Sequence, residues 1–235
     1  MIFRVIALII GYFWGTIQTG YIYGKMRGVD IRQHGSGNTG ATNSLRTFGW
    51  QGGLITFVGD CFKAVLSILI VQILLGNSFE GSSSLLEMYA GIGAVLGHNF
   101  PFYLKFKGGK GIACTVAVIL CACPITAPVC LIVFFSTVFL SKYVSLGSIL
   151  MVLSFMIQVL IFNSYGMLGI EESVLLEFNI LSTLFCIMAI IRHKDNIVRL
   201  LNGTEHKIGK IRCFQNPDHG RYASITKQQM VLGRD

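Results

Sequence analysis

Charged residues are scarce in this sequence of 235 residues. Asp, Glu, Lys and Arg make up 13% of it, against about 25% in soluble domains, while hydrophobic residues make up 53%. A chain this apolar cannot hide so much surface in one soluble core, so we expect a bilayer around it. The net charge of +8 comes without an RNA- or DNA-binding signature. The basic residues therefore predict orientation in a membrane and anionic partners, with no nucleic acid among them.

Paired cysteines are also lacking. Seven is an odd count, which argues against a disulfide framework, and Cys121 and Cys123 stand one residue apart without a second ligand pair. We predict neither a metal site nor a cofactor. The cysteines within apolar runs are most simply small buried hydrophobes: Cys61, Cys114, Cys121, Cys123, Cys130 and Cys186.

Long apolar runs cover most of the chain. They occupy residues 2–23, 53–75, 85–96, 112–140, 144–162 and 178–191. The run at 112–140 contains Pro124 and Pro128, so it forms one long kinked helix or two short spans, and two spans turning at 123–128 explain the prolines better. The sequence therefore predicts an all-α, polytopic membrane domain over residues 1–207, with about seven transmembrane helices, followed by a C-terminal tail at 208–235.

Lysine and arginine are absent from two polar loops, 77–84 and 163–177. They cluster instead in 24–50, in 105–110, at Lys142 and from Arg192 onward. Seven spans place these two sets of segments on opposite sides of the membrane, whereas six would put Lys142 on the wrong side. The positive-inside rule then predicts an outer N-terminus, with Arg4 as the exception, and polar motif loops and tail on the cytoplasmic face.

One polar segment, 97–111, ends in the string Lys107-Gly108-Gly109-Lys110-Gly111. Glycines allow main-chain amides to approach a ligand closely, and successive amides form an anion-binding nest. Lysine adds a point charge suited to phosphate, and the apolar run that follows would place a helix N-terminus at the same spot. We interpret the segment as a phosphate site at a membrane face. The alternative is a basic loop that only fixes topology.

A second polar segment, 30–46, interleaves glycines with short hydroxyl and amide side chains and then an arginine. Such side chains bond to phosphate oxygens or to their own backbone, and Arg46 offers a bidentate fork. On a helix, Thr42 would share a face with Asn38 and Arg46. A phosphate site and a capped turn before the next helix fit this pattern equally well. The candidate phosphate ligands are Ser36, Gly37, Asn38, Thr42, Asn43 and Arg46.

A third segment, 192–207, places His193, Asn196 and Arg199 at three-residue spacing, roughly one face of a helical turn. A snorkelling basic flank explains its charges but not the histidine together with the asparagine. All three segments fall on the cytoplasmic side of the predicted topology. We therefore predict one anion-binding pocket at the membrane surface, where a phosphate-bearing polar substrate meets a lipid-phase partner.

Two opposite charges lie inside a predicted span. Asp60 and Lys63 are three residues apart and so share a helical face. Charges in a span are costly and usually point to the protein interior. Mutual neutralisation is the simpler interpretation of this pair, and a polar wall of the active cleft is the functional alternative.

The three polar segments together closely resemble the bacterial glycerol-3-phosphate acyltransferases that use acyl phosphate as donor, the PlsY family. The matching motifs, in order, are 35–43 with Arg46; Gly97-His98, Phe100-Pro101 and 107–111; and His193, Asn196-Ile197, Arg199, 203–205 and Lys207. The resemblance implies a seven-span, monomeric enzyme of the bacterial cell membrane, which needs no acyl-CoA and makes lysophosphatidic acid. Cys114 stands where the family more often has threonine, and the tail after about Lys210 lies outside the resemblance.

For that reaction, the 1-hydroxyl of glycerol 3-phosphate attacks the acyl carbonyl and phosphate leaves. The donor is a mixed anhydride, so direct transfer needs no acyl-enzyme intermediate. Ser36, Arg46 and Lys110 would contact phosphate, supported by Lys107 and the amides of Gly108, Gly109 and Gly111. His193 and Asn196 would orient the acceptor, with Glu205 as a brace and Asp60 and Lys63 as further support. The proton acceptor is His193 or, as we favour, a substrate phosphate oxygen. An acyl groove between spans would be lined by Gly91, Gly93 and Gly97.

Two other functions fit the sequence less well. A Ser-His hydrolase would place its serine in a nucleophile elbow, but Ser36 stands in G-S-G rather than G-x-S-x-G. A phosphate or organic-anion transporter would have inverted repeats with polar groups from both halves near mid-membrane, and Asp60 with Lys63 has no second matching pair. A lipid product formed without a sealed compartment separates the acyltransferase from the transporter.

Overall fold

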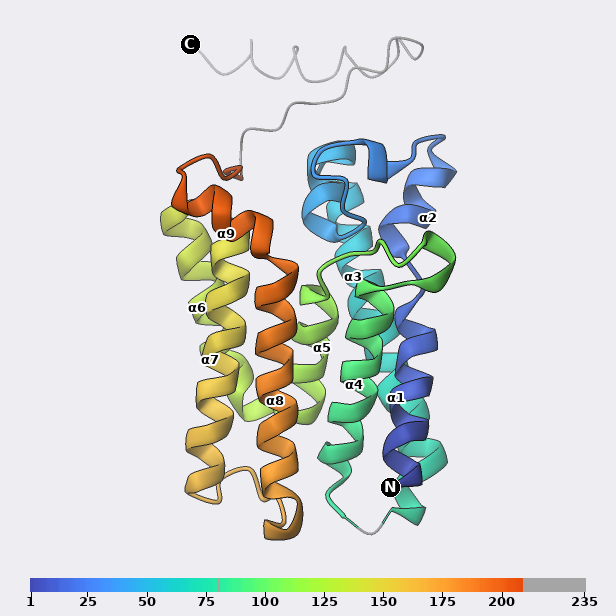
Figure 1. Ribbon diagram of the computed structural model, residues 1–235, viewed down its shortest axis with the longest axis vertical. Helices are drawn as coiled ribbons and strands as arrows, with labels where there is room; N and C mark the ends of the chain where they lie inside the picture. Colours follow the sequence, from blue (N-terminus) through green and yellow to red (C-terminus); the bar gives the residue numbers. More distant parts are fainter. Residues whose placement is uncertain (80, 209–235) are drawn as a thin grey trace, which may run out of the picture.

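The computed structural model describes residues 1–79 and 81–208, and every regular element within them is a helix (Figure 1). The predicted all-α membrane class is confirmed, and the predicted tail from residue 209 onward lies outside the described residues. The longer helices are α1 (Ile2–Gly15), α2 (Thr19–Met26), α3 (Ala41–Leu75), α4 (Ser83–Asn99), α5 (Ile112–Ala122), α6 (Ala127–Ser141), α7 (Val144–Ser164), α8 (Glu172–Arg192) and α9 (Lys194–Leu201).

Five helical segments of the described chain are long and apolar enough to cross a membrane. They are Ile2–Met26, Ala41–Ser78, Pro124–Ser141, Val144–Ser164 and Glu172–Arg192. The apolar helix α5 is shorter, and α4 lies beside α1 in the same bundle. Seven crossings therefore stay a prediction. The run at 112–140 is two helices, because the chain leaves α5 at Cys123 and turns through Pro124 into α6, which runs the opposite way in Figure 1.

Glycine packs α1 against α4 at very close range. A Cβ on Gly11 or Gly15 of α1 would lie about 2 Å from a carbonyl oxygen of α4, at 2.0 and 2.2 Å. A Cβ on Gly93 or Gly97 would meet carbonyl oxygens of α1 at 2.2 and 2.1 Å. Small residues let helix backbones approach in this way, which strengthens van der Waals packing in a membrane.

The same contact corrects the predicted acyl groove. Gly93 and Gly97 face α1, and the third member of that glycine face, Gly91, packs on Val118 of α5. The expectation that these glycines line a groove is wrong, because neighbouring helices fill the space beside them.

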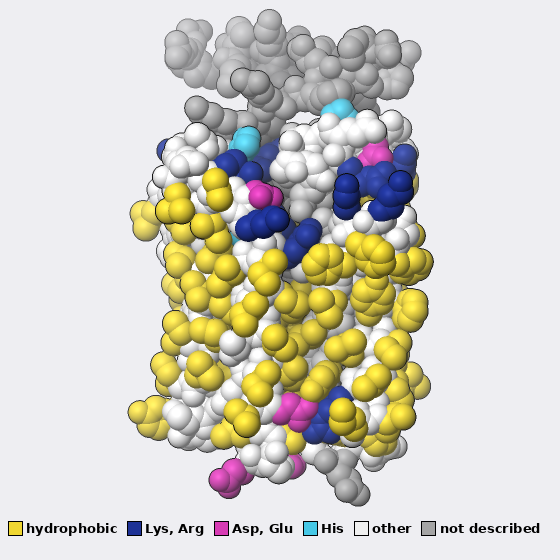
Figure 2. All heavy atoms as spheres, in the orientation of Figure 1, with side chains coloured by type: hydrophobic (Ala, Val, Ile, Leu, Met, Phe, Trp, Pro, Cys, Tyr) yellow, Lys and Arg dark blue, Asp and Glu magenta, His cyan; other side chains and the backbone are white. Residues whose placement is uncertain are grey.

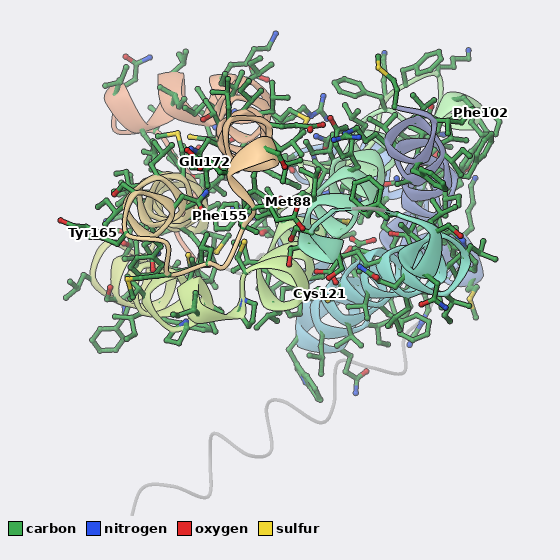
Figure 3. All side chains as sticks on the ribbon, turned by 90° about the horizontal axis from the view of Figure 1, so that it is seen from below. Met88, Phe102, Cys121, Phe155, Tyr165 and Glu172 are labelled. Carbon is green, nitrogen blue, oxygen red and sulfur yellow. The ribbon has the colours of Figure 1, made fainter. Side chains whose placement is uncertain are left out.

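Buried apolar side chains fill the middle of the bundle. Seen end-on in Figure 3, Met88 and Phe155 lie among the helices, whereas Phe102 and Tyr165 lie at the periphery. Many large apolar side chains remain exposed along the outer surfaces of the helices, and they form the broad yellow band of Figure 2. Such an exposed apolar belt suits a hydrocarbon solvent rather than water.

Basic side chains gather at one end of this belt, which is the upper end in Figure 2. Helix α9 lies at the same end of the bundle (Figure 1). The N-terminus lies at the other end. Arg4, the predicted exception, forms two hydrogen bonds with Glu177 of α8, at 2.6 and 2.8 Å. Tyr89 of α4 also donates to this carboxylate, so one carboxylate joins α1, α4 and α8 at the less basic end.

The first predicted span is interrupted. α1 ends at Gly15, Gln18 has a non-helical backbone (φ −100°, ψ 89°), and α2 begins at Thr19. A break in a membrane helix frees backbone carbonyl groups that need other donors. The Tyr103 hydroxyl donates to the Thr16 carbonyl at 2.8 Å, and the Lys63 ammonium donates to the Ile17 carbonyl.

Candidate active site

Three segments far apart in the sequence line one cavity of about 130 Å³ at the basic end of the bundle. Ten of the predicted site residues line this cavity: Ser36, Asn38, Thr42, Arg46, Asp60, Lys110, Gly111, His193, Asn196 and Glu205. All five predicted catalytic residues are in this set. Its apolar lining includes Phe57, Ile112, Ala113, Phe134 and Val144. The cavity is therefore lined by cationic and polar groups together with apolar side chains.

Asn43 shapes the loop that carries Ser36. Its side-chain oxygen accepts from the Ser36 amide at 2.8 Å, and its Nδ2 donates to the carbonyls of Ile31, His34 and Asn38 at 3.3, 3.0 and 2.8 Å. The side chain is buried and does not line the cavity. Gly37, with φ +69°, also lies outside the lining and supplies a left-handed turn. The segment is thus both a self-bonded turn and one wall of the cavity.

The glycines of the lysine loop serve close packing. The amides of Gly108 and Gly109 donate to the carbonyls of Asn99 and His98, at 3.2 and 3.0 Å. A Cβ on Gly109 would lie 1.8 Å from Nε2 of His98. Arg192 donates to the carbonyls of both glycines, with a shortest distance of 2.7 Å to Gly109. These two amides are therefore engaged within the chain rather than pointing together at a ligand.

Lys110 and Gly111 are the part of the loop that lines the cavity, whereas Lys107 is exposed and lies outside it. Gly111 caps α5 in the left-handed conformation, with φ +78°. The first amides of a helix have no intrahelical acceptor, and Ile112 and Ala113 of that first turn also line the cavity. The predicted helix N-terminus is thus present, and it offers the positive end of its dipole to the cavity.

A hydrogen-bonded chain holds the Lys110 ammonium. The Lys110 ammonium donates to Oδ1 of Asn196, and Nδ2 of Asn196 donates to Glu205 at 2.8 Å. Arg199 and Ser145 donate to the same carboxylate at 2.8 and 3.1 Å. Burial opposes ionisation of Glu205, but these hydrogen bonds outweigh it and lower the pKa of the carboxyl. Glu205 therefore stays charged and orients the amide that faces Lys110.

Burial lowers the pKa of Lys110 to about 8, although the attraction of Glu205 opposes the shift. Two further cations near the lysine, Arg199 and Arg46, act in the same direction as burial. An anion entering the cavity would offset both the cost of burying the ammonium and its repulsion from the two arginines. The ammonium is thus placed to gain from a bound phosphate.

His193 is held as a neutral imidazole. Its Nδ1 lies 2.8 Å from the Ala189 carbonyl, which can only accept, so Nδ1 carries the proton and Nε2 is an acceptor. Burial and then the charge of Lys110 lower the pKa of His193 to about 4. At neutral pH the ring can accept a hydrogen bond from a hydroxyl group, but it is a weak base.

A buried group beneath the cavity includes one residue that was not among the predicted site residues. Asp60 lies 2.9 Å from Lys63, and both are nearly inaccessible. His98 lies 2.8 Å from Lys63 through Nδ1 and lines the cavity together with Asp60. Asp60 and Lys63 thus neutralise each other, and Asp60 also forms part of the polar wall of the cavity. The sequence held a signal for His98, since it follows an apolar run and opens the lysine-bearing segment.

The comparisons with known proteins point to one family. The family model described as glycerol-3-phosphate acyltransferase matches residues 5–203. A protein of that name from Alkaliphilus metalliredigens is 41% identical over 88% of this chain and 97% of its own length. One from Staphylococcus haemolyticus is 39% identical over 87% of this chain and 97% of its own length.

Solved structures point the same way. The crystal structure of PlsY (YgiH), an integral membrane glycerol 3-phosphate acyltransferase, in its glycerol 3-phosphate form has a TM-score of 0.73. It is 32% identical, and the match covers 88% of this chain and 96% of that one. Its lysophosphatidic acid form gives a TM-score of 0.71. The predicted resemblance is confirmed, and the chain belongs to the glycerol-3-phosphate acyltransferase family of integral membrane proteins.

Proposed function

We propose that the chain transfers a fatty acyl group from acyl phosphate to the 1-hydroxyl of glycerol 3-phosphate, giving lysophosphatidic acid and inorganic phosphate. The observation that carries the proposal is the shared cavity, in which Arg46, Lys110 and His193 come from three distant segments. Family membership supports the acceptor, and one relative, PlsY (YgiH), has been solved in a glycerol 3-phosphate form and a lysophosphatidic acid form. The acyl-phosphate donor rests on the motif resemblance and on the density of cations.

Two anionic headgroups that repel each other must meet in this reaction. Arg46 and Lys110 supply positive charge, Ser36 and Thr42 supply hydroxyl groups, and the first turn of α5 supplies amides. Preorganised donors of this kind stabilise charge without reorganising during the reaction. The apolar lining beside them suits the acyl chain, which would enter from the hydrocarbon side. We assign Asn43, Gly108 and Gly109 to shaping these loops.

The chemical step is direct. The acceptor oxygen forms a bond to the acyl carbon, the bond from that carbon to the phosphate oxygen breaks, and the electron pair leaves with phosphate. The hydroxyl proton passes to a phosphate oxygen, because neutral His193 has a pKa of about 4 and binds protons weakly. Nε2 of His193 accepts a hydrogen bond from the hydroxyl and aligns it for attack. No acyl-enzyme intermediate is needed, because the anhydride is already activated.

The first experiment supplies purified protein in detergent with radiolabelled glycerol 3-phosphate and acyl phosphate. We expect a radiolabelled lipid and free phosphate without acyl-CoA. Lipid formed in detergent would exclude transport as the sole activity. Uptake of label into sealed vesicles without any lipid product would refute the proposal.

The second experiment tests the cavity. We expect Lys110→Ala, Arg46→Ala and Asn196→Ala each to lose roughly 100-fold or more in kcat/KM, as removal of one stabilising donor does elsewhere. Lys194→Ala is the matched control, because this exposed lysine begins α9 and does not line the cavity. Wild-type kinetics in all three cavity variants would refute the assignment of this cavity as the active site.

A further inference from the structure

Four buried polar side chains lie directly beneath the two loops of the cavity. Gln18 is 0% exposed, Asp60 1%, and Lys63 and His98 3% each. They come from the break between α1 and α2, from α3 and from the end of α4. Burying charged groups within a membrane bundle is costly, so their mutual contacts call for a reason beyond packing.

The Lys63 ammonium makes three polar contacts there. It forms an ion pair with Oδ1 of Asp60 at 2.9 Å, lies 2.8 Å from Nδ1 of His98 and donates to the Ile17 carbonyl. The Ile17 carbonyl is available because Gln18 leaves the helical conformation. The break in the first span and the buried lysine therefore depend on each other.

Lys63 also selects the tautomer of His98. Because the ammonium only donates, Nδ1 of a neutral His98 carries no proton and Nε2 carries it. Nε2 adjoins Gly109, where it takes the space of a Cβ. The ring thus rests against the lysine loop one residue before Lys110.

Gln18 connects this group to both loops. Its Nε2 donates to the His98 carbonyl at 3.0 Å, and the same carbonyl accepts from the Gly109 amide at 3.0 Å. Its Oε1 accepts from the Thr39 hydroxyl at 2.6 Å, in the loop that carries Ser36. One buried amide side chain therefore joins the Ser36 loop to the Lys110 loop.

We propose that Gln18, Lys63 and His98, with Asp60 as counter-ion, are positioning residues that set the separation between the Ser36 loop and Lys110. The inference rests on the proposed function, because that separation determines how two phosphate-bearing substrates meet. A misplacement of about 1 Å can cost on the order of 100-fold in rate. Gln18 and Lys63 do not line the cavity, so they act on the reaction through the loops and not by touching the reacting atoms.

Gln18→Leu is the test variant, because it removes both hydrogen bonds without leaving a charge unpaired. Gln158→Leu is the matched control. Gln158 is also buried, and it bonds within the bundle to Ser154 and Cys130. It lies ten residues beyond Ser148, the last residue of α7 that lines the cavity, which is about 15 Å along the helix.

Two readouts are measured on both variants and the wild type in detergent. The first is kcat/KM for glycerol 3-phosphate, which we expect to fall at least tenfold in Gln18→Leu and less than twofold in Gln158→Leu. The second is hydrogen–deuterium exchange of the peptide over residues 99–111, which holds the Gly109 amide. We expect this peptide to exchange at least tenfold faster in Gln18→Leu alone.

Failure of the network and failure of the proposed function give different results. If the wild type makes lipid but Gln18→Leu matches it within twofold in turnover and exchange, the network is refuted and the function stands. If the wild type makes no lipid, the function is refuted and the exchange readout decides the network by itself. Equal losses in Gln18→Leu and Gln158→Leu would show general destabilisation and would also overturn the positioning role.

Discussion

At the scale of single residues, the side chains around the cavity divide into those that face it and those that build its walls. Ser36, Arg46 and Lys110 face it, whereas Asn43 directs every polar atom of its side chain at its own loop. The sequence identifies both kinds, because hydroxyl, amide and cationic groups in glycine-rich segments suit phosphate. It cannot separate them, because spacing does not specify which hydrogen-bond partner a side chain finds. His98 was overlooked for the same reason, since its partners Lys63 and Asp60 lie on another helix.

The lowered pKa of Lys110 predicts a pH dependence. The group is charged below its pKa of about 8 and loses its charge as the pH rises through that value. We therefore expect kcat/KM for glycerol 3-phosphate, which reports the free enzyme, to fall above about pH 8. Lys110→Arg should be slower but should lack this alkaline decline, because arginine keeps its charge in this range. An identical decline in Lys110→Arg would assign it to another group.

At the scale of elements, the turn between α5 and α6 follows from the sequence and the break after α1 does not. Pro124 lacks a backbone donor and ends the helical run, so two helices could be predicted. Residues 16–18 contain neither glycine nor proline. The break there is stabilised by tertiary contacts, from Tyr103 and Lys63 to the freed carbonyls. Local propensity gives no sign of such contacts.

The close contact between α1 and α4 predicts that two glycines of α4 differ in how much their replacement by alanine destabilises the protein. A Cβ on Gly97 would meet backbone of α1 at 2.1 Å, whereas a Cβ on Gly91 would meet the side chain of Val118 at 2.4 Å. A side chain can rotate away and a helix backbone cannot. We expect Gly97→Ala to destabilise the protein by about 1–3 kcal/mol through overpacking and Gly91→Ala to cost less. Thermal unfolding of both variants in detergent measures this, and equal midpoints would contradict the packing argument.

At the scale of the whole molecule, basic side chains are sorted to one end of an apolar belt (Figure 2). The sequence predicts this sorting, because loops without Lys or Arg alternate with basic ones. The same alternation predicts seven crossings, and five helical segments of the described chain have the length and hydropathy expected of a span. α4 and α5 fall short of that length, with 17 and 11 residues. Their place in the bundle is recognised from the helices packed around them.

Orientation in the membrane is tested by thiol labelling. Glu171 lies in the acidic loop at the end of the bundle near the N-terminus, and Lys105 lies in the exposed part of the lysine loop. We expect a membrane-impermeant maleimide to label Glu171→Cys in intact cells and Lys105→Cys only after the membrane is opened, because the basic end should face the cytoplasm. The unmodified chain gives the background from native cysteines. Labelling in the reverse order would invert the proposed topology.

The shortness of α5 has a consequence for the surrounding lipid. Its 11 residues rise about 16 Å, roughly half of a hydrocarbon layer about 30 Å thick. In Figure 1 its turn into α6 stops well short of the far end that α7 and α8 reach. A span shorter than the hydrocarbon layer is accommodated by local thinning of the bilayer, so we expect thinning beside this turn. Turnover in reconstituted membranes should consequently respond to lipid tail length, with thin bilayers deforming least around α5.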